Sequence, residues 1–134
     1  MAEDLTWLLS RLSEKVPGTR SAVLLSADGI AKSWHGLDQD GAETLAAMAS
    51  GLCSLSQQVG TRFSGGEGVR QVLAELGDII LFVTAASVGT VLAVLASREV
   101  DAGILSYEMG RLSTQIPAYL ATPARQQAAV NGNW

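Results

Sequence analysis

The sequence contains few of the residues that usually carry chemistry. Its 134 residues include one cysteine and one histidine, and aromatic residues make up only 5%. One cysteine excludes an intramolecular disulfide and fits a reducing compartment. One histidine and one cysteine also exclude the common zinc-ligand sets. We therefore expect a protein that holds no metal or cofactor and is not an enzyme.

Charge is scarce as well. Charged residues make up 16% of the chain, against roughly 25% in an average domain. The nine Lys and Arg residues form no basic stripe and the formal net charge is −4, which argues against a nucleic-acid partner and against binding to an anionic membrane. Residues 1–7 are acidic and lack the basic region of a secretory signal. We expect a cytoplasmic protein without direct membrane insertion, and recruitment to a membrane through a partner stays open.

Hydrophobic residues make up 48% of the chain, which is enough for a sizeable core in one domain of this length. From residue 122 onwards Pro, Gln, Ala, Asn and Gly follow one another with little hydrophobic periodicity. We predict one domain over residues 1–120 and a flexible C-terminal tail over residues 121–134.

A stretch without a single charged residue, 44–61, is the most informative segment. Its serines and glutamines make it too polar to span a membrane. It has an apolar stripe at helical spacing and, beside it, a side of small residues. We expect the stripe to cover the protein's own sheet and the small side to face a twin helix. The stripe is Leu45, Met48, Leu52, Leu55 and Val59, and the small side is Ala42, Ala46, Ala49 and Cys53.

The order of the remaining elements indicates one mixed domain. We expect helices over residues 4–15 and 101–116, the second ended by Pro117, and a long helix from Asp38 or Asp40 to about Val59. Strands are expected over residues 21–26, 30–34, 69–76, 79–85 and 90–96. Strand hairpins before and after a long helix predict an antiparallel five-stranded sheet with helices on both faces. The fold class is α/β in the broad sense, and more narrowly α+β.

The strand at 69–76 carries Arg70, Gln71 and Glu75 and is expected at an edge of the sheet, whereas the next two strands are apolar on both faces and are expected in its centre. Residues 72–74 have no charge between them. Pairing of this edge with its copy about a two-fold axis would cover both edges at once.

Three features could be mistaken for catalytic or phosphate-binding sites. His35 has no nucleophile or carboxylate beside it in the sequence, so we interpret it as structural. Cys53 lies among aliphatic residues and is interpreted as a small packed hydrophobe. The glycine-rich stretch 65–68 lacks the Lys-Ser/Thr ending of a phosphate loop and precedes a strand, so we interpret it as a linker.

Taken in order, these segments resemble the Roadblock/dynein light chain family in its small actinobacterial form. The resemblance is carried by residues 16–34, 45–60 and 69–97, together with Tyr107-Glu108-Met109 after an aspartate, and it spans roughly residues 5–119. It implies a profilin-like five-stranded antiparallel sheet between helices, in the order α-β-β-α-β-β-β-α. It also implies a homodimer that binds a small Ras-like GTPase, as an activator of hydrolysis or as a signalling platform, in a set that includes a sensor-kinase-like protein.

Carried onto this sequence, the resemblance implies a dimer contact through the long helix and the neighbouring strand. Arg62 and Arg70 are the arginines nearest the helix, and nothing in the sequence marks either as an arginine finger. A passive scaffold stays open as an alternative, and a small-molecule sensor is less favoured because small aliphatic residues suggest tight packing. The expected contact residues are Leu45, Met48, Ala49, Leu52, Cys53, Leu55, Ser56, Val72 and Ala74.

Overall fold

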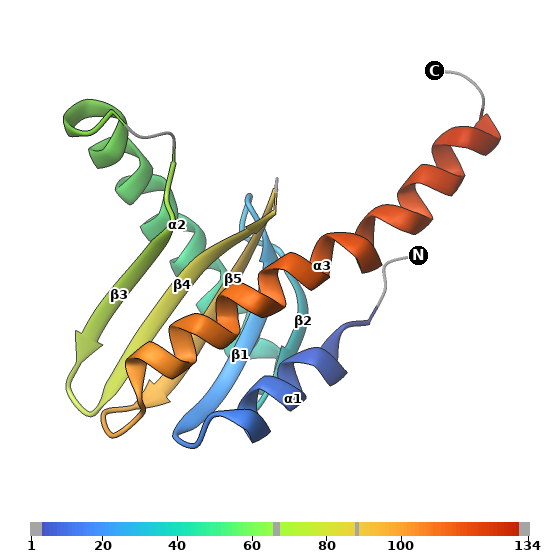
Figure 1. Ribbon diagram of the computed structural model, residues 1–134. Helices are drawn as coiled ribbons and strands as arrows, with labels where there is room; N and C mark the ends of the chain where they lie inside the picture. Colours follow the sequence, from blue (N-terminus) through green and yellow to red (C-terminus); the bar gives the residue numbers. More distant parts are fainter. Residues whose placement is uncertain (1–3, 66–67, 88, 132–134) are drawn as a thin grey trace.

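The computed structural model describes residues 4–65, 68–87 and 89–131, with only the backbone described for residues 87 and 117–131. Three helices and a five-stranded antiparallel sheet follow in the order α-β-β-α-β-β-β-α, which confirms the predicted fold class (Figure 1). The elements are α1 (Thr6–Lys15), β1 (Thr19–Ser26), β2 (Ala31–His35), α2 (Gln39–Phe63), β3 (Gln71–Leu76), β4 (Ile79–Ser87), β5 (Thr90–Ser97) and α3 (Ala102–Asn131).

The strands lie in the order β2-β1-β5-β4-β3, so β2 and β3 form the two edges of the sheet. The polar strand β3 is an edge and the apolar strands β4 and β5 are interior, as the sequence predicts. Val72 lies opposite Val83 and Leu73 opposite Phe82 across the β3–β4 pair. Because successive side chains point to opposite faces, this register assigns Val72 to one face of the sheet and Leu73 to the other.

One face of the sheet is covered by α1 and α3 (Figure 1). Leu9 on α1 and Met109 on α3 are fully buried in one cluster with Phe82 of β4, and the other large side chains that these helices direct inward are buried or nearly so. Their apolar positions recur at helical spacing, so each helix buries one stripe and leaves its polar side in water. This core contains Leu5, Leu8, Leu9, Leu12, Val16, Ala22, Leu24, Ile80, Phe82, Leu92, Val94, Ala96, Val100, Leu105, Met109, Leu112 and Ile116.

Within the part of the chain that the structure describes, the opposite face of the sheet is covered by α2 alone. Ala42, Ala46 and Ala49 are fully buried there, with Leu45 nearly so. These four residues pack on Val23, Leu25, Leu81, Val83, Val91 and Ala93 of the sheet. The alanines allow the helix to lie close to a surface that is already filled by branched side chains.

Aspartate side chains begin both of the longer helices, as predicted. The Asp38 carboxylate accepts a hydrogen bond from the Gly41 N–H at 2.8 Å, and the Asp101 carboxylate accepts one from the Ile104 N–H at 3.0 Å. Each bond satisfies an N–H group that has no partner within the helix. Of the two acidic residues proposed to begin α2, Asp38 is therefore the cap and Asp40 lies in the first turn.

Helix α3 is longer than the sequence pattern indicates. It continues to Asn131, so the expected end at Ile116 is wrong. A proline inside a helix removes one hydrogen bond and costs about 3 kcal/mol, but it bends helices as well as ending them. The residues after Pro117 include many alanines, glutamines and an arginine, which favour helix. The division into a domain over residues 1–120 and a tail over residues 121–134 stays a prediction.

Candidate self-association interface

From Met48 onwards α2 exposes large apolar side chains, and its second half leaves the sheet. Its buried residues all lie between positions 42 and 49, and Figure 1 shows the C-terminal half extending past the strands. The exposed fractions are 64% for Met48, 62% for Leu55, 59% for Val59 and 79% for Phe63. An apolar row of this length on one helix is typical of a surface that another protein covers.

These side chains lie along one side of the helix. Positions 48, 52, 55, 59 and 63 are three or four residues apart, which is the spacing of neighbours on one helical face. Leu52 is half-buried and connects the row to the core under α2. We call these five residues, Met48, Leu52, Leu55, Val59 and Phe63, the α2 stripe.

The sides of α2 are reversed relative to the sequence-based expectation. Its small residues face the protein's own sheet, and most of its large apolar residues face outward. The exception is Leu45, which is only 9% exposed and packs on the sheet. Ala49 has no exposed surface in the protomer and packs on the sheet, so its predicted partner contact has no support from its position. The physical reason is space, because the branched side chains of the sheet already fill much of the layer under α2, and three of the four residues that pack on them are alanines.

The open edge of the sheet lies on strand β3. Within the described residues β3 pairs with β4 alone, so its other edge has no neighbouring strand. Val72 and Ala74 are half-buried and pack on the same core as α2. Leu73 and Leu76 are exposed. An edge with exposed leucines and unpaired backbone groups is a template for a further strand.

Between residues 44 and 61, the flank of α2 away from the stripe is polar but uncharged. Ser50 Oγ donates a hydrogen bond to the Ala27 carbonyl at 2.7 Å and so fixes the helix against the β1–β2 turn. A hollow of about 300 Å³ lies beside it, lined in part by Cys53, Ser54 and Gln57. Burial raises the pKa of the half-buried Cys53 thiol, which keeps it protonated and supports its interpretation as a packed hydrophobe rather than a nucleophile.

The structure brings most of the predicted contact residues to one region. Met48 and Leu55 are exposed, and Leu52, Cys53, Ser56, Val72 and Ala74 are half-buried. Phe63 was missed because the helix was expected to end near Val59, although it continues the same spacing by four residues. Val59 was predicted as part of the apolar stripe but was not among the expected contact residues.

Other candidate groups do not gather into a chemical site. His35 lies at the end of β2 opposite Ala22, and Arg62 and Arg70 are exposed near the two ends of the loop between α2 and β3. Among the described residues, no three His, Cys, Asp or Glu side chains are placed to share a metal ion. Within the same part of the chain, the helices are too short or too polar to cross a membrane.

Comparison with known proteins places this geometry in a family. A Roadblock/LC7 domain model matches residues 5–96. The crystal structure of a Roadblock/LC7 domain from Streptomyces avermitilis shares 55% identity, covering 90% of this chain and 100% of that one, with a TM-score of 0.87. A second Roadblock/LC7 domain from the same organism shares 37% identity over 84% and 98% of the chains, with a TM-score of 0.68.

A more distant structure, that of MglB with tetrameric arrangement, shares the fold. It is 13% identical over 86% of each chain, with a TM-score of 0.77. No curated protein matches the chain. The family model covers the helix and the strand edge described above. The chain belongs to the Roadblock/LC7 domain family.

Proposed function

We propose that this protein is a homodimeric regulatory subunit that binds a small Ras-like GTPase. The observation that carries the proposal is the α2 stripe beside the open edge of β3. Both surfaces are apolar, both are left uncovered by the chain itself, and they share one core through Leu52, Val72 and Ala74. A second copy offers the same stripe and the same edge, as a two-fold contact requires.

The gain from covering the stripe supports a stable dimer. Full burial of a large apolar side chain contributes about 1.5–3 kcal/mol. Four stripe residues, Met48, Leu55, Val59 and Phe63, each have more than half of their surface still exposed. Pairing of the two β3 edges would add backbone hydrogen bonds and join two sheets into one. The tetrameric arrangement of MglB is a property of that protein, and it agrees with self-association as a use of this fold.

The GTPase partner is proposed from family membership. Roadblock proteins bind small Ras-like GTPases as activators or platforms, as the resemblance of the sequence implies. We favour regulation by positioning the GTPase's own catalytic groups over an arginine supplied in trans. Arg62 and Arg70 are exposed, and nothing in the sequence marks either as an arginine finger.

The test uses the intact chain and a small Ras-like GTPase encoded in the same genome. The GTPase is loaded with GDP or with a non-hydrolysable GTP analogue, and binding is measured by calorimetry. We expect binding that differs at least tenfold between the two nucleotide states. Hydrolysis measured under single-turnover conditions then separates an activator, which raises the rate, from a platform, which leaves it unchanged.

Equal binding in both nucleotide states would contradict the regulatory proposal and favour a passive scaffold. Absence of binding to any such GTPase would contradict both. A cytoplasmic location and a sensor-kinase-like protein as a further partner belong to the same proposal, and co-purification from the native cell checks them.

A further inference from the structure

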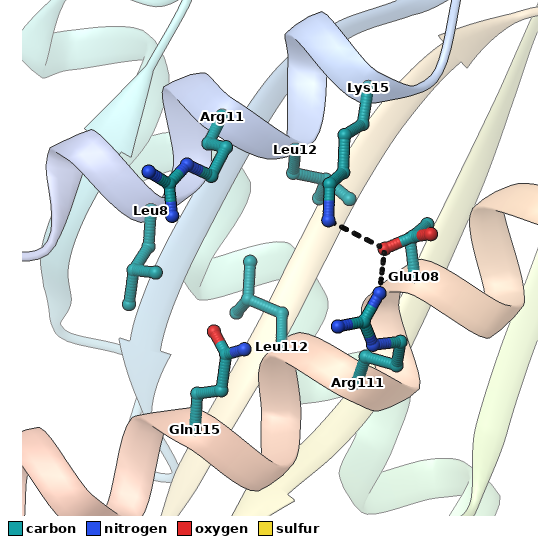
Figure 2. A pocket seen from close by; sticks show the side chains of 8 residues that line it. All are labelled: Leu8, Arg11, Leu12, Lys15, Glu108, Arg111, Leu112 and Gln115. Atoms are coloured by element: carbon teal, nitrogen blue, oxygen red, sulfur yellow. Dashed lines mark ion pairs between the residues drawn. The ribbon is translucent and has the colours of Figure 1, made fainter.

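A second surface lies on the opposite side of the sheet from α2. There α1 and α3 pack side by side and leave a shallow groove of about 50 Å³ between them (Figure 2). Leu8 and Leu12 from α1 and Leu112 from α3 form its floor. These leucines are almost completely buried, so the groove has a fixed apolar base rather than a loose one.

The rim of the groove carries an excess of positive charge. Lys15 Nζ and Arg111 Nη1 approach the same oxygen of Glu108, at 3.5 and 3.6 Å, and Figure 2 shows both contacts converging on that atom. The Lys15 and Arg111 side chains are 47% and 49% exposed, whereas the Glu108 side chain is 18% exposed. Arg11 adds a third cation to the lining. One carboxylate cannot neutralise three cations, and this excess occurs in a chain of net charge −4.

The two helices that form the groove also carry exposed apolar and aromatic side chains. The Arg11 guanidinium lies 5.5 Å from the centre of the Trp7 ring, on the first helix. On α3, Ile104 and Tyr107 are exposed one turn before Glu108 and Arg111. Aromatic residues make up only 5% of the chain, yet two of them are exposed here. Trp, Tyr and Arg are the residues most enriched at the energetic centres of protein interfaces.

We propose that the α1–α3 groove docks an acidic, partly apolar segment of another protein. Carboxylates of that segment accept hydrogen bonds from Arg11, Lys15 and Arg111, and its apolar side chains cover Trp7 and Tyr107. Charge complementarity selects the partner, because the cations lie in a groove with an apolar floor where their attraction is less screened than at an open surface. The sheet separates this groove from the α2 stripe, so docking here requires neither dimerisation nor the proposed GTPase.

The experiment titrates the intact, isotope-labelled protein with a short acetylated peptide of Glu, Leu and Ala, followed by NMR. The matched peptide has Gln in place of every Glu. We expect shifts in the backbone amides of Arg11, Lys15 and Arg111 with the Glu peptide, and at least tenfold weaker binding of the Gln peptide. Raising the salt concentration weakens the Glu peptide's binding.

Variants assign the effect to the groove. Lys15→Gln/Arg111→Gln weakens binding of the Glu peptide by about tenfold, and Glu108→Gln strengthens it because the competing carboxylate is removed. A gain in affinity cannot arise from poor folding. The control Arg62→Gln/Arg70→Gln removes the same charge from residues that do not line the groove and leaves the affinity unchanged.

Any of three results with the peptides would overturn the proposal: equal binding of the Glu and Gln peptides, absence of shifts in the groove, or an equal loss in the control variant. Vesicles containing phosphatidylserine are tested in parallel. If they bind through Lys15 and Arg111 and the peptide does not, the groove recognises a lipid surface and the proposal is wrong.

Discussion

The two faces of the sheet are built from the same kinds of strand residue but are covered differently. On one face α1 and α3 together enclose Leu24, Phe82 and Leu92 completely. On the other face one helix covers Val23, Val83 and Ala93, and it uses alanines to do so. The first face is closed by the protomer itself. The second ends in an open strand edge and an exposed apolar stripe (Figure 1).

The difference indicates that one set of residues determines the stability of the protomer and another set determines its association. Large side chains between two helices and the sheet supply the protomer's own core. The single helix on the other face positions side chains that the protomer does not use. Changes on the first face should therefore alter the free energy of unfolding, and changes to the stripe should alter association.

The largest effect is expected from Phe82→Ala on the closed face. Phe82 is fully buried between the helices and the sheet, and removing a buried phenyl ring costs about 3–5 kcal/mol. Urea unfolding at a fixed protein concentration measures the loss. Tyr107→Ala, at an exposed position on the same side, should change stability by less than about 0.5 kcal/mol. Similar losses in both variants would contradict the enclosed core.

Next in size is Leu55→Glu on the stripe. Leu55 is mostly exposed in the protomer, so the fold should tolerate the change, whereas a dimer would have to bury an unpaired charge at a cost of about 3 kcal/mol. We expect self-association to weaken about a hundredfold, measured by fluorescence anisotropy of labelled protein. Leu52→Glu also weakens the dimer, but Leu52 is half-buried and its change affects the fold as well.

The polar flank of α2 supplies the control for this prediction. Ser54→Glu places the same charge on the same helix, in the hollow away from the stripe. It should leave association unchanged. An equal loss in Ser54→Glu would show that the stripe is not the contact.

A smaller effect is expected from Ala46→Leu, which tests the side of α2 that faces the sheet. Ala46 is fully buried against the sheet, and overpacking costs about 1–3 kcal/mol. Thermal unfolding checks this, with Ala47→Leu at the exposed neighbouring position as the matched control. If Ala46 instead faced a twin helix, its change would weaken association and leave the protomer's stability intact.

The smallest effect concerns Cys53, which packs partly on the core under α2 and partly lines the hollow beside that helix. Burial disfavours the thiolate and raises the pKa of Cys53 above its ordinary value of 9.0. Alkylation by iodoacetamide needs the thiolate, so its rate should rise at a higher pH than for a free cysteine. Mass spectrometry follows the reaction. A midpoint at or below pH 9.0 would contradict the half-buried position.

Local signals in the sequence were sufficient for the elements and their layers. Asp38 and Asp101 indicate helix starts because short acidic side chains bond free N–H groups, and the polar residues of 69–76 indicate an edge because interior strands have no room for charge. Which side of α2 faces the sheet was not predictable in the same way. Between residues 44 and 61 both of its sides are uncharged, and periodicity locates an apolar side without showing how much space the opposing sheet leaves.

The end of α3 shows a similar limit. Pro117 is a strong local signal, yet the residues that follow it favour helix and the chain continues as one. The groove between α1 and α3 was not predictable at all, since Lys15 and Glu108 come together only when the two helices pack on the same face.

Sedimentation equilibrium of the intact wild-type chain, beside Leu55→Glu/Val59→Glu, tests the separation of the two faces most directly. We predict a wild-type mass of twice the 14.0 kDa protomer at micromolar concentration. The double variant should have the protomer mass with an unchanged circular dichroism spectrum. A monomeric wild type, or a double variant that stays dimeric, would contradict the account.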